Sequence, residues 1–201
     1  MNDADRNPAQ ELPERPFDEM LQAVLASDDL SVVQTPLARI TRDFFQYNWI
    51  YCRDGLLAKT RRIRVEPLGL PAPRVFKFEI DTPFKRRRED GSLELEPGPV
   101  RGTIYYRPDL MVNPDSPAIA VTLDRELGFF HPNFSRKHSA ACLGDLPGGP
   151  YPLDALLEDH VFPILSYQNR RPSHPADVEA ARYFALDPQA MVGLDRVEPL
   201  Y

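Results

Sequence analysis

The chain has 201 residues, of which 42% are hydrophobic and 10% aromatic, which is enough for one domain with a substantial core. Its net charge of -6 at pH 7 excludes general binding to nucleic acid, because a negatively charged protein does not neutralise the negative charges of a phosphate backbone. No stretch approaches the ~20 apolar residues of a membrane span, and the polar N-terminus is unlike a secretory signal. With two cysteines and no export signal, we expect a cytoplasmic protein without disulfides.

The first part of the chain predicts a polar extension and two helices. Residues 1–16 are rich in Pro, Asn, Asp and Glu and are expected to be disordered. Apolar residues at helical spacing follow from Phe17 to Leu25. A second helix is predicted over 35–49, where Thr35 can cap the helix and Pro36 suits its first position. The apolar stripe of this helix comprises Leu37, Ile40, Phe44 and Tyr47.

Four strands are predicted next, separated by turn signals and not by helices: residues 62–66, 75–80, 100–107 and 118–123. Asp90-Gly91 is a hairpin turn signal, and the basic run Lys85–Arg88 beside it is expected at a solvated hairpin tip. Consecutive strands with short connections favour an antiparallel meander.

The last part of the chain predicts an irregular segment and then helices. Residues 128–150 show little periodicity and end in Pro-Gly-Gly-Pro, which excludes a helix or a central strand there. A helix is predicted from Pro152 to Leu165, with Pro163 expected to kink it or end it early, and another over 175–184. This order indicates an α+β domain over 17–187, followed by an irregular tail, 188–201.

The irregular segment holds the residues that carry chemistry. His131-Pro132-Asn133 is followed, nine residues after the asparagine, by Cys142. A thiol near a side-chain amide suits acyl transfer through a thioester, because the sulfur attacks a carbonyl and the amide can stabilise the oxyanion. Taken separately, the tripeptide is an ordinary turn and the cysteine a small buried hydrophobe. The second cysteine, Cys52, is expected to be packed and unreactive.

These motifs and their order resemble the ubiquitin-conjugating enzyme family. That family runs through a helix, a four-strand meander, His-Pro-Asn, a catalytic cysteine, a long helix and a further helix. Its tripeptide matches His131, Pro132 and Asn133. Its cysteine, followed by leucine and soon by aspartate, matches Cys142-Leu143-Gly144-Asp145, and the paired alanines and tyrosine of its last helix match Ala180-Ala181-Arg182-Tyr183. The resemblance covers about residues 35–184.

The chain also departs from the family pattern. The cysteine lies one residue further from the asparagine than is usual, and Tyr151-Pro152 stands near the place of the family's tryptophan. His174 occupies the late turn where many members carry an acidic residue. These differences indicate a divergent, bacterial member.

The resemblance implies a UBC-like fold and an enzyme without a cofactor or metal. Cys142 would accept a ubiquitin-like protein from an activating enzyme and pass it to an amine. Asn133 would stabilise the oxyanion or brace the loop that holds the site, whereas His131 and Pro132 would order the turn. His174 is a candidate acceptor for the proton of the amine, and Asp145 a candidate to orient that amine.

The resemblance also implies partners. The helix over 35–49 corresponds to the place where the family docks its activating enzyme, and its outward residues include Arg39, Arg42 and Asp43. A ligase and a deconjugating protease are further partners that the family allows, whereas nucleic acid and membranes are not expected. Some bacterial relatives of this kind belong to antiviral defence.

Three alternatives remain open from the sequence. Cys142 with His131 or His138 could form the nucleophile–base pair of a cysteine hydrolase. The same three residues could bind zinc, although the spacing of strong zinc motifs is absent. The chain could also be a non-catalytic UBC-like binding module.

Overall fold

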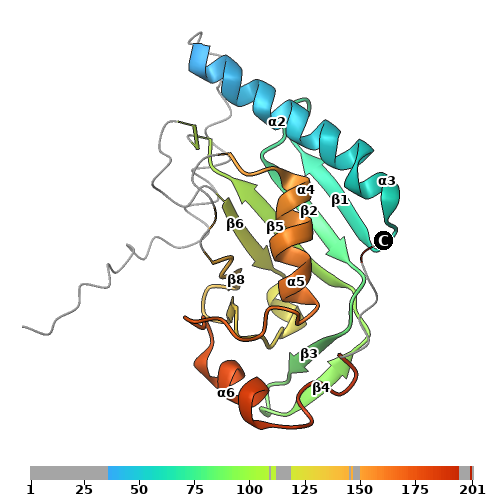
Figure 1. Ribbon diagram of the computed structural model, residues 1–201, viewed down its shortest axis with the longest axis vertical. Helices are drawn as coiled ribbons and strands as arrows, with labels where there is room; N and C mark the ends of the chain where they lie inside the picture. The colour runs from blue at the N-terminus through green and yellow to red at the C-terminus, as the bar shows by residue number, and fades with distance from the viewer. Residues whose placement is uncertain are drawn as a thin grey trace, which may run out of the picture. The chain divides into compact units, whose positions relative to one another are not determined.

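The computed structural model describes residues 36–108, 110–111, 119–144, 146, 150–194 and 200. The expectations for residues 1–16, for the helix from Phe17 to Leu25 and for Asp145 therefore lie outside the described residues. The described part is an α+β structure with a six-stranded antiparallel sheet, a separate two-stranded hairpin and several helices (Figure 1). No helix within these ranges has both the length and the apolar character to cross a bilayer.

The four predicted strands are present and pair antiparallel in chain order: β1 (Ile63–Leu68), β2 (Val75–Ile80), β5 (Val100–Tyr106) and β6 (Ile119–Leu123). The prediction of a four-strand sheet is nevertheless wrong in number. The sheet continues beyond β6 through β8 (Ala140–Ala141) to β7 (Phe134–Ser135). Strands of two residues are too short for a period of two to appear in the sequence.

Side chains of the central strands alternate between a buried face and a charged face of the sheet. The buried face includes Phe76, Phe78 and Ile104. On the same face, a Cβ atom at Gly102 would lie 2.1 Å from the Thr122 carbonyl oxygen and 2.8 Å from Cζ of Phe78. Only glycine therefore allows the Phe78 ring to pack at this position.

A hairpin of β3 (Phe84–Arg87) and β4 (Leu93–Glu96) is inserted between β2 and β5. The predicted turn is present, with Gly91 at φ 83° and the Ser92 amide donating to Oδ1 of Asp90 (2.9 Å). The basic run is placed differently from the prediction. Its first three residues, 85–87, lie within β3, and only Arg88 lies at the turn.

The first described helix, α2 (Pro36–Asp54), is longer than the predicted 35–49 and is followed by the short α3 (Leu56–Lys59). The predicted stripe is wrong, because Ile40 and Tyr47 are 55% and 53% exposed. The buried residues of α2 are Thr41, Phe45, Asn48 and Cys52. Asn48 lies inward because its Oδ1 accepts a hydrogen bond from the amide of Leu153 (2.6 Å), the first residue of a later helix.

One continuous helical stretch lies against the buried face of the sheet (Figure 1). It comprises α4 (Leu153–Ala155), a π-helical segment η2 (Leu156–Val161) and α5 (Phe162–Leu165). Pro163 lies within α5, and the helix ends two residues later, as predicted. The wider π-helical turns come directly before this proline, whose ring would crowd the preceding turn of a regular α-helix.

The chain after α5 ends in α6 (Val178–Leu186) and a packed tail. Helix α6 begins three residues later than predicted, because Oδ1 of Asp177 accepts from the Ala180 amide (3.0 Å) and caps it. Beyond residue 187, the described residues Ala190, Leu194 and Leu200 are buried, and the Thr60 hydroxyl donates to the Leu200 carbonyl (2.6 Å). The folded unit therefore extends past the boundary predicted from the sequence.

Candidate functional site

The His131-Pro132-Asn133 turn connects the buried Phe130 to β7. The Phe134 amide donates to the His131 carbonyl (3.0 Å), which closes the turn. The Asn133 amide donates to Nδ1 of His131 (2.9 Å). From outside the turn, the Asp177 amide donates to the Pro132 carbonyl (3.0 Å). Hydrogen bonds within the turn and from the start of α6 thus fix its backbone.

His131 is a buried, neutral residue of this turn. Its side chain is fully buried, and its ring centroid lies 5.8 Å from that of Phe129 and 4.8 Å from that of Tyr167. Burial lowers the pKa of the imidazole to about 3, because the charged form would lose its hydration. Since Nδ1 accepts the Asn133 amide, the proton lies on Nε2, which is buried without a partner among the described residues.

The Asn133 side chain joins the turn to the loop after α5. It is 2% exposed, and its Nδ2 donates to the Asn169 carbonyl oxygen at 2.9 Å. Its Oδ1 is buried without a hydrogen-bond partner within the described ranges. The amide therefore braces the loop through one of its two N–H groups.

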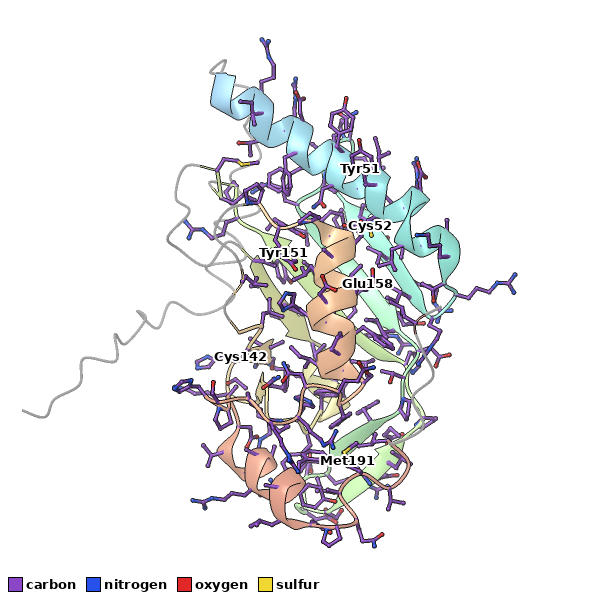
Figure 2. The ribbon with its side chains drawn as sticks, in the orientation of Figure 1. Tyr51, Cys52, Cys142, Tyr151, Glu158 and Met191 are labelled. Atoms are coloured by element: carbon purple, nitrogen blue, oxygen red, sulfur yellow. The ribbon has the colours of Figure 1, made fainter. Side chains whose placement is uncertain are left out.

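Cys142 lies directly after β8 and beside Asn133. Its amide donates to the Asn133 carbonyl (2.7 Å), which continues the pairing of Phe134 with Ala141. The thiol is exposed and free (Figure 2). Cys52, by contrast, is buried, and its pKa is raised to about 12, first by burial and then by the negative charge of Asp154. The chain thus offers one accessible thiol, next to the asparagine with which it was predicted to act.

Two residues after α5 that the sequence did not single out, Tyr167 and Asn169, also build the site. Tyr167 is buried with φ 60°, and its hydroxyl donates to the Phe130 carbonyl (2.9 Å) and accepts from the Lys85 amide (2.9 Å). It therefore links the hairpin, the turn and the loop that Asn133 braces. No local pattern marks either residue, whereas Asp177, three residues before Ala180, carries a recognisable N-cap signal.

The remaining predicted site residues lie on exposed parts of the molecule. His174 is exposed, with Nδ1 3.2 Å from the Ser173 hydroxyl. His138 is exposed in the connection between β7 and β8. On α2, Arg39 and Arg42 are exposed and Asp43 is half-buried. Helix α2, which carries Tyr51, lies apart from Cys142 (Figure 2).

The zinc site and a hydrolase that uses His131 as its base gain no support from the geometry. Within the described ranges, no group of three or more His, Cys, Asp or Glu side chains is placed to hold a metal ion, and His131, His138 and Cys142 do not form one. A hydrolase base would have to take the proton of Cys142. His131 is poorly suited to this role because its pKa is lowered to about 3 and its Nδ1 is occupied.

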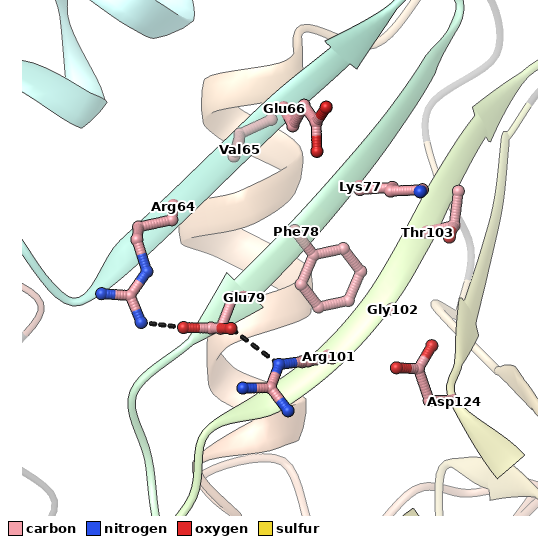
Figure 3. Close-up of a pocket in the computed structure, with 10 residues that line it drawn as sticks. All are labelled: Arg64, Val65, Glu66, Lys77, Phe78, Glu79, Arg101, Gly102, Thr103 and Asp124. Atoms are coloured by element: carbon pink, nitrogen blue, oxygen red, sulfur yellow. Dashed lines mark hydrogen bonds and ion pairs between the residues drawn. The ribbon is translucent and has the colours of Figure 1, made fainter. Parts of the chain in front are cut away.

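A separate hollow of about 480 Å³ lies on the charged face of the sheet (Figure 3). Its lining residues come mainly from β1, β2 and β5, and include neither Cys142 nor the turn. At one end, the Glu79 carboxylate accepts from Arg101 (2.7 Å) and pairs with Arg64. The charges at this end of the hollow are paired with one another, and the exposed Cys142 thiol lies outside it.

No protein-family model matches the chain, and no curated protein sequence matches it. The described geometry can support nucleophilic chemistry at one sulfur atom. A thiolate is the reactive form of cysteine, and Cys142 is exposed on a backbone that hydrogen bonds hold in place. The adjacent turn, which binds the Cys142 amide through the Asn133 carbonyl, holds a neutral histidine, His131, and the Asn133 side-chain amide.

Proposed function

We propose that this protein is a conjugating enzyme that carries a ubiquitin-like protein as a thioester on Cys142. The observation that carries the proposal is the backbone hydrogen bond from Cys142 to Asn133 (2.7 Å), which brings an exposed thiol to the His-Pro-Asn turn. The order of β1, β2, β5 and β6, followed by the turn, the cysteine and the α4–α5 helix, supports a UBC-like arrangement. The strands β7 and β8 and the β3–β4 hairpin are additions to it.

The proposed reaction has two acyl transfers. In the first, the Cys142 thiolate attacks the thioester carbonyl that joins the modifier to its activating enzyme; a new C–S bond forms and the activating enzyme leaves as a thiolate. In the second, an amine attacks the Cys142 thioester; a C–N bond forms, the C–S bond breaks, and the amine loses its proton to a base or to water. His174, exposed on the late turn, is the proposed acceptor of that proton.

Asn133 has a bracing role in this proposal. Its bond to the Asn169 carbonyl holds the loop after α5 against the turn, so that the surface around the thiol keeps one shape. Its remaining N–H group is the proposed donor to the oxyanion when an acyl group is bound. Asp145 lies outside the described residues, and its proposed role in orienting the amine rests on the resemblance alone.

A gel assay tests the function. The protein is incubated with ATP, a ubiquitin-like protein and the activating enzyme of that modifier, and the products are separated without reductant. We expect a covalent adduct that thiols release, that Cys142→Ala abolishes and that Cys52→Ala retains. Free modifier released without an adduct would support the hydrolase alternative. No adduct with a demonstrably active activating enzyme would support the binding module.

Docking of the activating enzyme on α2 is tested in the same assay. Arg39 and Arg42 are exposed on this helix, apart from the thiol. Arg39→Glu combined with Arg42→Glu should slow loading from the activating enzyme without changing how fast a preformed thioester is discharged. Equal effects on both steps would contradict a docking role.

A further inference from the structure

Two loops near Cys142 carry a positive charge that contrasts with the rest of the chain. Residues 136–146 and 166–176 contain four cationic side chains and one acidic one, whereas the whole chain has a net charge of -6. The cationic residues are Arg136, Lys137, Arg170 and Arg171. The acidic residue is Asp145, which lies outside the described residues. Two further basic groups of these loops, His138 and His174, are exposed.

Hydrogen bonds hold both loops close to the thiol. The Cys142 amide is bound to the Asn133 carbonyl, and Asn133 Nδ2 is bound to the Asn169 carbonyl, directly before Arg170. Standard bond lengths then place the Arg170 backbone within roughly 15 Å of that of Cys142. The turn of the β7–β8 hairpin lies about 10 Å along the strand from Cys142, at ~3.3 Å per residue.

The charges of these loops differ in how far they are already neutralised. The Arg136 guanidinium pairs with Asp177 (2.6 Å) and Glu179 (3.0 Å), so its charge is compensated within the fold. The Arg170 guanidinium donates to the Tyr167 carbonyl oxygen (3.4 Å). Because this oxygen carries no formal charge, the contact does not neutralise the arginine. Arg171 is exposed. With Arg136 compensated, we place the recognition of the acyl donor on the loop after α5, which carries Arg170 and Arg171.

We propose that the polypeptide carried on Cys142 has an acidic C-terminal tail. This inference rests on the proposed function and names the chemistry of its acyl donor. An extended tail advances ~3.3 Å per residue, so the residues three to six positions before the reacting carbonyl would lie roughly 10–20 Å from the thiol, the same range as the Arg170 backbone. The proposal places the tail on the side of the thiol that carries Arg170 and Arg171. Carboxylates at these positions would be attracted to the arginines, and basic residues would be repelled. This attraction changes the rate at which donor and enzyme associate more than the rate of the acyl-transfer step.

Synthetic peptide thioesters test this inference without an activating enzyme. Three hexapeptides end in a glycine mercaptoethanesulfonate thioester and carry two Glu, two Ser or two Arg residues at the third and fourth positions before the reacting carbonyl. The Cys142 thiolate attacks the glycine carbonyl, the peptide–Cys142 C–S bond forms, and mercaptoethanesulfonate leaves as its thiolate. Intact-mass spectrometry measures acylation of the full chain, with Cys142→Ala as the blank.

We expect the Glu peptide to acylate Cys142 about tenfold faster than the Ser peptide at low salt, and the Arg peptide to react most slowly. The preference should disappear at 0.5 M salt, because screening shortens the range of the attraction. Arg170→Glu combined with Arg171→Glu should reverse it. The matched control, Arg53→Glu combined with Arg61→Glu, makes the same change in net charge at exposed positions on α2 and before β1, and should leave the preference intact.

Equal rates for the three peptides would overturn the inference. So would a control variant that loses the preference for the Glu peptide as the Arg170/Arg171 variant does. The proposed function would then still stand, provided that the Ser peptide acylates Cys142 and the gel assay yields the adduct. Failure of every peptide to react with Cys142, together with no adduct on the gel, would overturn both.

Discussion

The Tyr167 hydroxyl and the Phe130 carbonyl oxygen lie 2.9 Å apart, joining the loop after α5 to the residue that precedes His131. The same hydroxyl accepts from the Lys85 amide (2.9 Å), so two backbone groups depend on one buried oxygen atom. Tyr167→Phe should lower the free energy of unfolding by about 1–3 kcal/mol, because both partners would lose their hydrogen bond inside the core. Urea denaturation measures the loss.

Tyr51→Phe is the matched control for this substitution. The Tyr51 side chain is 67% exposed on α2, and removing its hydroxyl should change stability by less than ~0.5 kcal/mol. Equal stabilities for the Tyr167→Phe variant and the parent protein would show that the bond network does not hold the turn.

Asn133→Ala separates the two acyl transfers. Discharge of the Cys142 thioester to an amine should fall by about 10²–10³-fold if the amide stabilises the oxyanion. Loading should fall less, because a thiolate is already a good nucleophile. Single-turnover assays of each step measure the two effects. A uniform loss in both steps would leave Asn133 with the bracing role alone, through its bond to Asn169.

The buried imidazole of His131 should make stability depend on pH. Its pKa is about 3 in the folded protein, against about 6.5 when unfolded, so the unfolded chain binds more protons between these values. The contribution of this group is fully present above pH ~6.5 and is lost as the pH falls toward 3. Between pH 7 and pH 5, this residue should remove about 2 kcal/mol of stability.

Urea denaturation at both pH values tests the assignment with two variants. His131→Gln should remove this part of the pH dependence. His138→Gln, at an exposed position in the β7–β8 connection, should retain it. An unchanged pH dependence in His131→Gln would assign the titration to another group.

The two cysteines should differ sharply toward alkylating agents. The pKa of Cys52 is raised to about 12 by burial, so almost none of it is thiolate at neutral pH. Iodoacetamide should therefore add one label to the native protein, at Cys142, and a second only in urea. Peptide mapping by mass spectrometry checks the positions. Rapid labelling of Cys52 in the native protein would contradict its placement in the core.

Leu194 tests whether the last residues of the chain belong to the fold. This side chain is 2% exposed, and Leu194→Ala should cost about 2–5 kcal/mol, because it opens a cavity in the core. Leu186→Ala changes a leucine that is 80% exposed at the end of α6, and should cost far less. Thermal and urea unfolding compare the two. Similar effects would show that the tail packs loosely.

The sequence predicted the helices and strands that are long enough to show a hydrophobic periodicity. The four strands β1, β2, β5 and β6 and the helix to Leu165 alternate or repeat over several residues, and the structure has them in place. The short strands β7 and β8 lack such a pattern. The face of α2 was wrong because a tertiary contact, from Asn48 to the Leu153 amide, outweighs hydrophobic periodicity.

The candidate site was predictable only in its local part. The eight residues between Asn133 and Cys142 fold into a hairpin that brings the two together, and a motif of this spacing can suggest this proximity. Tyr167 and Asn169 reach the site across more than 30 residues of chain. No spacing rule connects them to the turn, because their positions depend on where the α4–α5 helix ends.

The bond between Thr60 and Leu200 holds the carboxyl end of the described chain beside the start of β1. Figure 2 shows Cys142 elsewhere on the molecule, in the orientation of Figure 1. A biosensor surface or fluorescent reporter attached after this point would be held at a different place on the molecule from the thiol. Immobilised protein should therefore remain open to macromolecular acyl donors.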